Sequence, residues 1–128
     1  MRCLIVDDSP RFVAAARALL EHDGMTIVGV ASSGAEALRL YEQLRPDVTL
    51  VDVNLGEESG FTVVEQLHRA GSATPLPLIL ISSQDEQEIG DLIAASPAFG
   101  FVHKSALTAD VIRDLVNSSP RVEKGQDG

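Results

Sequence analysis

Near its start the chain reads LIVDDSP, residues 4–10, and this stretch combines three signals that favour a parallel α/β fold. Its first three residues are apolar, which is typical of a strand buried on both faces of a sheet. Two aspartates follow directly. Ser9 and Pro10 then predict a helix start, with serine as the N-cap and proline at the first helical position. The stretch therefore predicts a strand that ends in carboxylates and leads at once into a helix.

The rest of the chain repeats this alternation of apolar strands and amphipathic helices. Further strands are expected at residues 25–30, 48–53, 78–81 and 99–103, and further helices should begin at Ser33, Phe61, Glu86 and Thr108. Residues 54–60 contain two glycines and are predicted as a loop. Five strands that alternate with five helices indicate a doubly wound parallel sheet, covered by helices on both faces and joined by right-handed crossovers.

The length and charge of the chain limit its organisation and its partners. Its 128 residues suit one domain, which we expect over residues 1–117, followed by a polar, flexible tail over residues 118–128. The net charge of −9 argues against direct binding to nucleic acid or to an anionic membrane surface. No apolar run approaches the ~18 residues that a membrane span needs. The single cysteine excludes an internal disulfide framework, so we expect a reducing cytoplasm.

Chemically active side chains follow four of the five predicted strands. In an open parallel sheet, sites lie beyond the carboxyl ends of the strands, where the strand order reverses. Each of these groups alone has a simpler explanation, such as a turn, a helix cap or an exposed lysine. Together at one edge they are a candidate site, and its members are Asp7, Asp8, Asp52, Asn54, Ser82, Ser83 and Lys104.

The chemistry of this set favours phosphoryl transfer. Clustered carboxylates repel one another unless a cation lies between them, and Mg²⁺ prefers such oxygen ligands. A metal ion, an ammonium and a hydroxyl are the groups that stabilise a phosphoryl group in transfer. Asp52 lies within an apolar strand, where a charge costs several kcal/mol unless it is paired. A carboxylate at this place can act as the nucleophile and form an aspartyl phosphate.

The chain resembles the receiver domains of response regulators in two-component signalling. The resemblance covers residues 3–117 and is carried by four motifs in order, which are Leu4-Ile5-Val6-Asp7-Asp8, Val51-Asp52-Val53-Asn54-Leu55, Ile81-Ser82-Ser83 and Phe101-Val102-His103-Lys104. It implies a flavodoxin-like (βα)5 fold with strand order 2-1-3-4-5. It also implies a cytoplasmic switch that is phosphorylated by a histidine kinase or a phosphotransfer protein, and that catalyses only its own phosphorylation and dephosphorylation.

The resemblance assigns a role to each member of the site. Asp52 would be the phosphoacceptor. Asp8 would bind Mg²⁺ directly and Asp7 through water, with Asp52 and the backbone carbonyl of Asn54 as further ligands. Lys104 would pair with a phosphoryl oxygen.

The resemblance also implies the path by which the signal leaves the site. The hydroxyl of Ser82 would bind the phosphoryl group, and Phe101 would change rotamer in response. Asn54, Ser83 and Gln84 would flank the phosphoryl group and modulate its lifetime. The fourth helix, fifth strand and fifth helix would then bind a second copy or an output domain.

Two positions depart from the family pattern. Ser105 stands where the family usually has a proline after the lysine, and since a cis peptide costs about 3–4 kcal/mol without proline, we expect a trans bond. Gly56 stands where many receivers have a proline, which predicts a looser loop.

Three other hypotheses remain open from the sequence. A haloacid-dehalogenase-type phosphatase also uses a strand-end aspartate and Mg²⁺, but it needs a second acid where this chain has Asn54. A flavodoxin-like cofactor binder would need a hydroxyl-rich phosphate loop after the first strand, where this chain has acids. A receiver-like module that takes no phosphate is disfavoured because every chemical position is filled.

Overall fold

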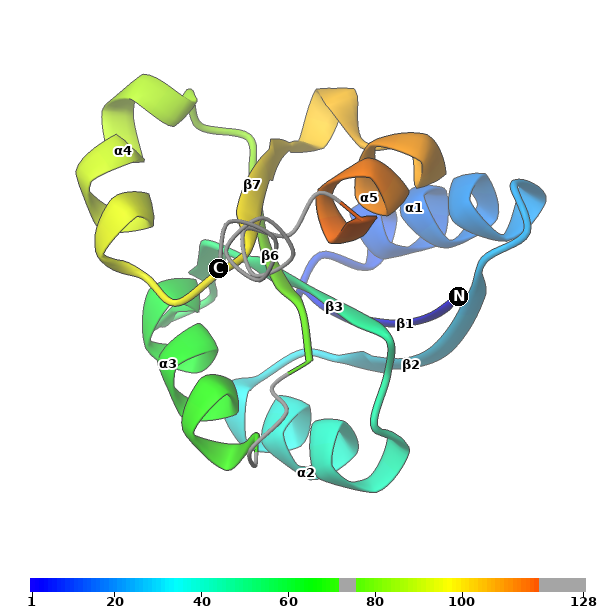
Figure 1. The fold of residues 1–128 in the computed structure, drawn as a ribbon, viewed down its shortest axis with the longest axis horizontal. Coiled ribbons are helices and arrows are strands. Elements are labelled where there is room, and N and C mark those ends of the chain that lie inside the picture. Colours follow the sequence, from blue (N-terminus) through cyan, green and yellow to red (C-terminus); the bar gives the residue numbers. More distant parts are fainter. Residues whose placement is uncertain (72–75, 118–128) are drawn as a thin grey trace, which may run out of the picture.

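The computed structural model describes residues 1–71 and 76–117, and these form a layered α/β structure (Figure 1). The predicted tail over residues 118–128 lies outside the described residues. The predicted alternation of strands and helices is confirmed, with β1 (Arg2–Val6), α1 (Pro10–His22), β2 (Thr26–Ala31), α2 (Gly34–Leu44), β3 (Val48–Asp52), α3 (Gly60–Ala70), β6 (Leu78–Ser82), α4 (Glu86–Ala95), β7 (Gly100–His103) and α5 (Ala109–Asn117).

The five long strands form one parallel sheet in the order β2-β1-β3-β6-β7. This is the expected order 2-1-3-4-5, because two short strands, β4 and β5, form a separate hairpin. The strand order reverses between β1 and β3, which are neighbours in the sheet although β2 lies between them in sequence. Val6 pairs with Val51, so the residues that follow these two strands emerge side by side.

Helices cover both faces of the sheet (Figure 1), and an apolar core lies on each face. One core lies between the sheet and helices α1 and α5, and includes Ala16, Leu20 and Ile112. The other lies against α2, α3 and α4, and includes Tyr41 and Leu67. All five residues of β3 are buried, as the continuous apolar run predicted for a strand covered on both faces.

The first two helices begin where the sequence predicts. Ser9 caps α1 by accepting a hydrogen bond from the backbone N–H of Phe12, at 3.3 Å. Ser33 caps α2 in the same way through the N–H of Glu36, at 3.2 Å. The Glu36 carboxylate in turn accepts a hydrogen bond from the N–H of Ser32, at 2.9 Å.

The structure differs from the sequence expectation after two of the strands. Residues 54–59, predicted as a loose loop, contain a small antiparallel hairpin of β4 (Asn54–Leu55) and β5 (Glu58–Ser59). Gly56 lies in its turn at φ +62°, a conformation that glycine adopts without strain. After β7 a short 3-10 helix, η1 (Lys104–Ala106), precedes α5. The Lys104–Ser105 peptide is trans, as expected, since no described peptide bond is cis.

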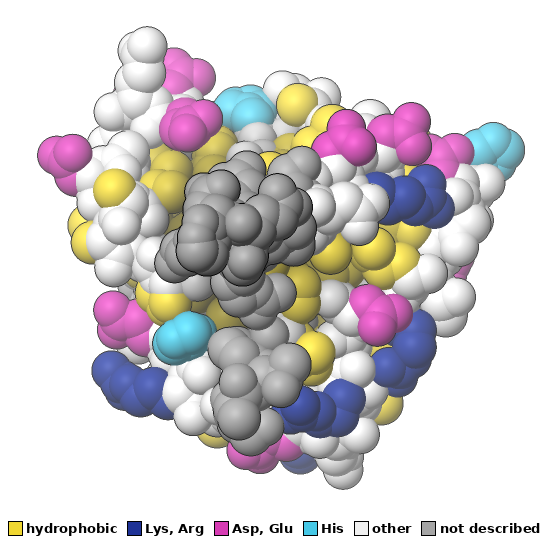
Figure 2. All heavy atoms as spheres, in the orientation of Figure 1, with side chains coloured by type: hydrophobic (Ala, Val, Ile, Leu, Met, Phe, Trp, Pro, Cys, Tyr) yellow, Lys and Arg dark blue, Asp and Glu magenta, His cyan; other side chains and the backbone are white. Residues whose placement is uncertain are grey.

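Helix α4 has the fewest buried residues of the five helices. Ile89 is its one buried residue, and the backbone is kinked there. The N-cap residue Asp85 makes no side-chain capping bond, and Leu92 is 55% exposed. Figure 2 shows acidic side chains gathered over α4, where the N-cap Asp85 and the helix residues Glu86, Glu88 and Asp91 are exposed.

No helix in the described part of the chain is both long and apolar enough to cross a membrane.

Candidate functional site

Three carboxylates meet at the carboxyl ends of β1 and β3. Asp7, Asp8 and Asp52 each place an oxygen within 4.8 Å of the others. Asp7 is 2% exposed and Asp52 is 6% exposed, whereas Asp8 faces solvent. The cluster therefore combines two buried acids with one that a metal ion can reach from water.

Lys104, the first residue of η1, brings a positive charge to this cluster from just beyond the edge strand β7. Its Nζ lies 2.9 Å from Asp7 Oδ2 and 3.3 Å from Asp52 Oδ2. The ammonium also lies over the ring of Phe12, 4.2 Å from its centroid, which is a cation–π contact. Lys104 thus bridges both buried acids and also contacts α1 through the ring of Phe12.

The charges in this cluster do not balance. Three ionised carboxylates and one ammonium leave two negative charges, the complement of a divalent cation. Asp7 Oδ2 is buried and, despite its ion pair, accepts no well-directed hydrogen bond within the described structure. The donor set of carboxylate oxygens is also the one that Mg²⁺ prefers, so the residues fit a magnesium ion.

The electrostatics of the site favour added positive charge. Burial, followed by the nearby charge of Asp7, raises the pKa of Asp52 above its ordinary value. Burial opposes the charge of Lys104, but its contacts with Asp7 and Asp52 outweigh this and raise the pKa of the lysine. Ionised Asp52 is therefore costly in the free protein and gains from a cation beside it.

Polar groups from two loops lie at the same edge of the sheet as the Asp52 carboxylate. Its Oδ1 accepts a hydrogen bond from the backbone N–H of Asn54, at 3.2 Å. The buried Ser82 hydroxyl accepts one from the backbone N–H of Gln84, at 2.9 Å, and so keeps its own hydrogen for another acceptor. The Asn54 side chain donates to the Gln84 side chain at 3.1 Å and ties the two loops together.

Two further predicted residues lie at the edge of this arrangement. Ser83 is exposed, and its carbonyl lies 3.0 Å from the Nε2 of His103. Phe101 is half-buried on β7 and packs against the core on the α4 side of the sheet. The predicted site residues therefore lie at one edge of the sheet, and Phe101 lies on the edge strand that leads to Lys104.

Gly60, at the start of α3, packs directly against the backbone that carries the Asp52 side chain. A Cβ at this position would lie 2.0 Å from the carbonyl oxygen of Asp52, a distance that no real contact allows. The Gly60 N–H donates to the carbonyl of Val53 at 2.7 Å. From the sequence this glycine is predicted only as part of a loop, because its close approach to Asp52 depends on how α3 packs against β3.

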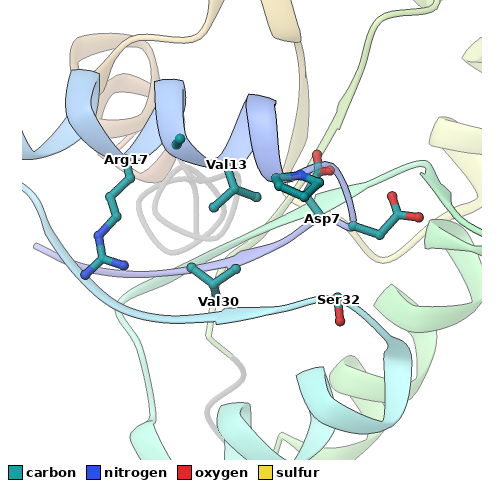
Figure 3. A pocket seen from close by; sticks show the side chains of 8 residues that line it. Asp7, Val13, Arg17, Val30 and Ser32 are labelled. Carbon is teal, nitrogen blue, oxygen red and sulfur yellow. The ribbon is translucent and has the colours of Figure 1, made fainter.

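A pocket opens beside the acidic cluster between α1 and β2 (Figure 3). It has a volume of about 460 Å³, with Asp7 at one end and Arg17 at the other. Val13 and Val30 form its apolar walls, and Ser32 lies near its acidic end. The pocket thus has apolar walls and a charged residue at each end.

Comparison with known proteins identifies the class to which this fold and site belong. The family model of the response regulator receiver domain matches residues 3–117, so the chain belongs to this family. The signal receiver domain of the response regulator NarL from Mycobacterium tuberculosis superposes with a TM-score of 0.80 at 28% identity, and the match covers 91% of this chain and 95% of that one.

Two curated relatives are longer proteins. The DNA-binding transcriptional activator EvgA of Escherichia coli K12 is 31% identical over 104 residues, which cover 81% of this chain and 50% of EvgA. A protein-glutamate methylesterase/protein-glutamine glutaminase of Alkalilimnicola ehrlichii is 37% identical over 84 residues, which cover 65% of this chain and 21% of that protein. The chain thus spans half of the first and about a fifth of the second.

The family defines the general function of the domain. A response regulator receiver domain is a phosphorylation-dependent switch of two-component signalling, and the fold described above is that of this class. The family assignment favours this function over the phosphatase and flavodoxin-like hypotheses.

Proposed function

We propose that Asp52 is the phosphoacceptor of this receiver domain. The observation that carries the proposal is the position of its carboxylate, which is buried, clustered with two other acids and 3.3 Å from the Lys104 ammonium. A carboxylate oxygen of Asp52 attacks the phosphorus of a phosphohistidine donor. The bond between phosphorus and the imidazole nitrogen breaks, and the imidazole leaves with the bonding electron pair.

The neighbouring residues stabilise the transferred group. Asp7, Asp8, Asp52 and the backbone carbonyl of Asn54 would hold Mg²⁺, which when bound neutralises charge on the carboxylates and the phosphoryl oxygens. Lys104 pairs with one phosphoryl oxygen, and the Ser82 hydroxyl donates a hydrogen bond to another. The donor is a histidine kinase or a phosphotransfer protein in the cytoplasm, and the chain catalyses no reaction beyond its own phosphorylation and dephosphorylation.

Incubation with acetyl phosphate and Mg²⁺ tests this function. We expect the intact mass to rise by one phosphoryl group, in a linkage that survives mild acid and is labile in base. A parallel sample with a chelator in place of Mg²⁺ should show no gain. A chain that gains no mass with Mg²⁺ present would refute the proposal.

Magnesium alone should stabilise the domain. Binding to the native state adds RT ln(1 + [L]/Kd), or about 1.4 kcal/mol at ten times Kd, and we expect a Kd in the millimolar range. Asp8→Ala should abolish the rise in melting temperature, because Asp8 is the carboxylate that faces solvent. Asp91→Ala on α4, away from the cluster, should leave the rise intact. An unchanged melting temperature of the unmodified chain in saturating Mg²⁺ would count against the site.

Dephosphorylation should depend on Asn54, whose side chain donates to Gln84 and whose backbone N–H donates to the Asp52 carboxylate. Asn54→Leu removes a group that can orient the attacking water, and we expect the phosphorylated chain to lose phosphate several-fold more slowly. The decay is followed by intact mass after acetyl phosphate is removed. Asn117→Leu, at the exposed end of α5, is the matched control. Equal decay in all three proteins would sink this prediction.

We further propose that the signal leaves through the face formed by α4, β7 and α5. Two observations support this: α4 has one buried residue, and Phe101 is half-buried. A small change in free energy on movement of Ser82 can then shift the position of the helix. The partner is a second copy or an output domain of the same protein. The match to half of a DNA-binding activator supports the second arrangement, in which DNA contacts come from outside residues 1–117.

Amide exchange with and without the phosphoryl analogue beryllofluoride tests this face. We expect the changes in protection to concentrate at residues 82–95 and 99–104. Changes confined to α1 and α2 would assign the output to another face.

A further inference from the structure

His103 connects the turn that carries Lys104 to the loop that follows Ser82. It is the last residue of β7 and pairs in register with Ser82 of β6. Its Nδ1 lies 3.1 Å from the backbone nitrogen of Ser105 and 2.7 Å from the Ser105 hydroxyl. Its Nε2 lies 3.0 Å from the carbonyl oxygen of Ser83. One ring thus contacts both loops that border the Asp52 site.

The contacts determine which ring nitrogen carries the hydrogen. The backbone N–H of Ser105 can only donate, so Nδ1 is an acceptor and carries no hydrogen. A neutral imidazole must then carry its hydrogen on Nε2. The Ser83 carbonyl can only accept, so Nε2–H donates to it. Both nitrogens are used, one to cap η1 and the other to hold the loop.

The bond from His103 Nε2–H to the Ser83 carbonyl holds the residue that directly follows Ser82. The loop is fixed at Ser83 by the ring of His103 and at Gln84 by its N–H bond to Ser82 and its side-chain bond to Asn54. Of these three bonds, the one to the Ser83 carbonyl is donated by a residue of β7. If Ser82 moves to donate to a phosphoryl group on Asp52, the adjoining Ser83 carbonyl must move with it.

We propose that His103 is a positioning residue that latches the β6–α4 loop in its unphosphorylated arrangement. The proposal rests on the proposed function of Asp52. A contact made only in the resting conformation lowers the population of the competing one, and so weakens apparent binding of any group that needs the competing conformation. Loss of the latch should therefore strengthen binding of a phosphoryl analogue.

Two substitutions separate the latch from the cap. His103→Asn places an amide oxygen near the position of Nδ1, so it can still accept from the Ser105 N–H, but it is too short to reach Ser83. His103→Gln places an amide nitrogen near the position of Nε2 and retains a donor for the Ser83 carbonyl. His68→Asn, on the exposed end of α3, is the matched control at another histidine.

The experiment measures the affinity for beryllofluoride at saturating Mg²⁺, followed by the backbone amide NMR signals of Ser83 and Gln84. We expect His103→Asn to bind about 3- to 10-fold more tightly than the unmodified chain, the equivalent of one hydrogen bond. His103→Gln and His68→Asn should stay within about 2-fold, a range smaller than the effect of one hydrogen bond. The affinity for Mg²⁺ alone should be the same in all four proteins, because the latch does not touch the carboxylates.

The outcomes separate the latch from the function on which it rests. Unchanged or weaker binding by His103→Asn would overturn the latch, as would an equal gain in both His103 variants. If the unmodified chain itself fails to bind beryllofluoride, the proposed function of Asp52 fails. ¹⁵N NMR of the His103 ring in the unmodified chain gives a measurement that needs no variant. We expect the hydrogen on Nε2 without the analogue, and a ring with its hydrogen on Nδ1 would also overturn the proposal.

Discussion

The Asp52→Asn variant should take up no phosphoryl group from acetyl phosphate under conditions in which the unmodified chain gains one. The amide has nearly the volume of the carboxylate but cannot act as its nucleophile. The fold should remain, since the side chain keeps its shape among the same neighbours. Intact mass measures the first result and circular dichroism the second. Asp91→Asn, an exposed residue of α4, should be phosphorylated as the unmodified chain is.

The same variant should be more stable than the unmodified chain at neutral pH without Mg²⁺. Because the pKa of Asp52 is raised in the folded state, the native chain binds more protons than the unfolded chain as Asp52 titrates, and its stability falls as pH rises through that range. Asparagine does not ionise, so its side chain adds no such dependence on pH. The difference in stability between the variant and the unmodified chain should therefore shrink when the pH is lowered until Asp52 is protonated.

Phosphorylation of the variant at this site would refute the assignment of Asp52.

Gly60→Ala should destabilise the domain by about 3 kcal/mol, near the upper end for overpacking. The added Cβ would lie 2.0 Å from the Asp52 carbonyl oxygen, and both partners are backbone atoms that no side-chain rotation can separate. Either α3 or the end of β3 must move, so phosphorylation should slow as well. Denaturant unfolding measures the loss, and the rate of mass gain with acetyl phosphate measures the displacement of the site.

Gly90→Ala is the matched control for this prediction. Nothing lies within 4 Å of a Cβ at Gly90, which is inside α4. Alanine there should stabilise by roughly 0.5–1 kcal/mol, because it removes the backbone entropy that glycine loses in a helix. The same change of residue should therefore have opposite signs at the two positions. A Gly60→Ala variant as stable as the unmodified chain would mean that α3 does not approach β3 as closely as described.

The positions of the acids and of Lys104 were predictable because strand direction alone determines them. In a parallel sheet every strand ends at the same edge, so apolar runs that end in Asp7 and Asp52 are enough to bring those carboxylates together. The family resemblance then supplied the strand order, and the structure confirms it.

Other features could not be predicted, because they depend on contacts between residues far apart in sequence or on elements too short to show a pattern. Phe12 has the spacing of an ordinary core residue in α1, and its contact with Lys104 joins residues 92 positions apart in the chain. The hairpin that includes Asn54 consists of strands two residues long, too short to show an alternation of apolar and polar residues. The role of His103 arises from three contacts in space, although the residue lies within a motif that the sequence already singled out.

The weak anchoring of α4 bears on how such a domain can diversify. A helix held by the buried side chain of Ile89 and the partly buried Ile93 offers most of its other positions to substitution at little cost, since exposed changes usually alter stability by less than about 0.5 kcal/mol. Asp7, Asp52 and Ser82, by contrast, are buried, and each has neighbours that restrict what can replace it. Descendants of this chain can therefore acquire new partners through the surface of α4 while the buried residues at the carboxyl edge of the sheet stay the same.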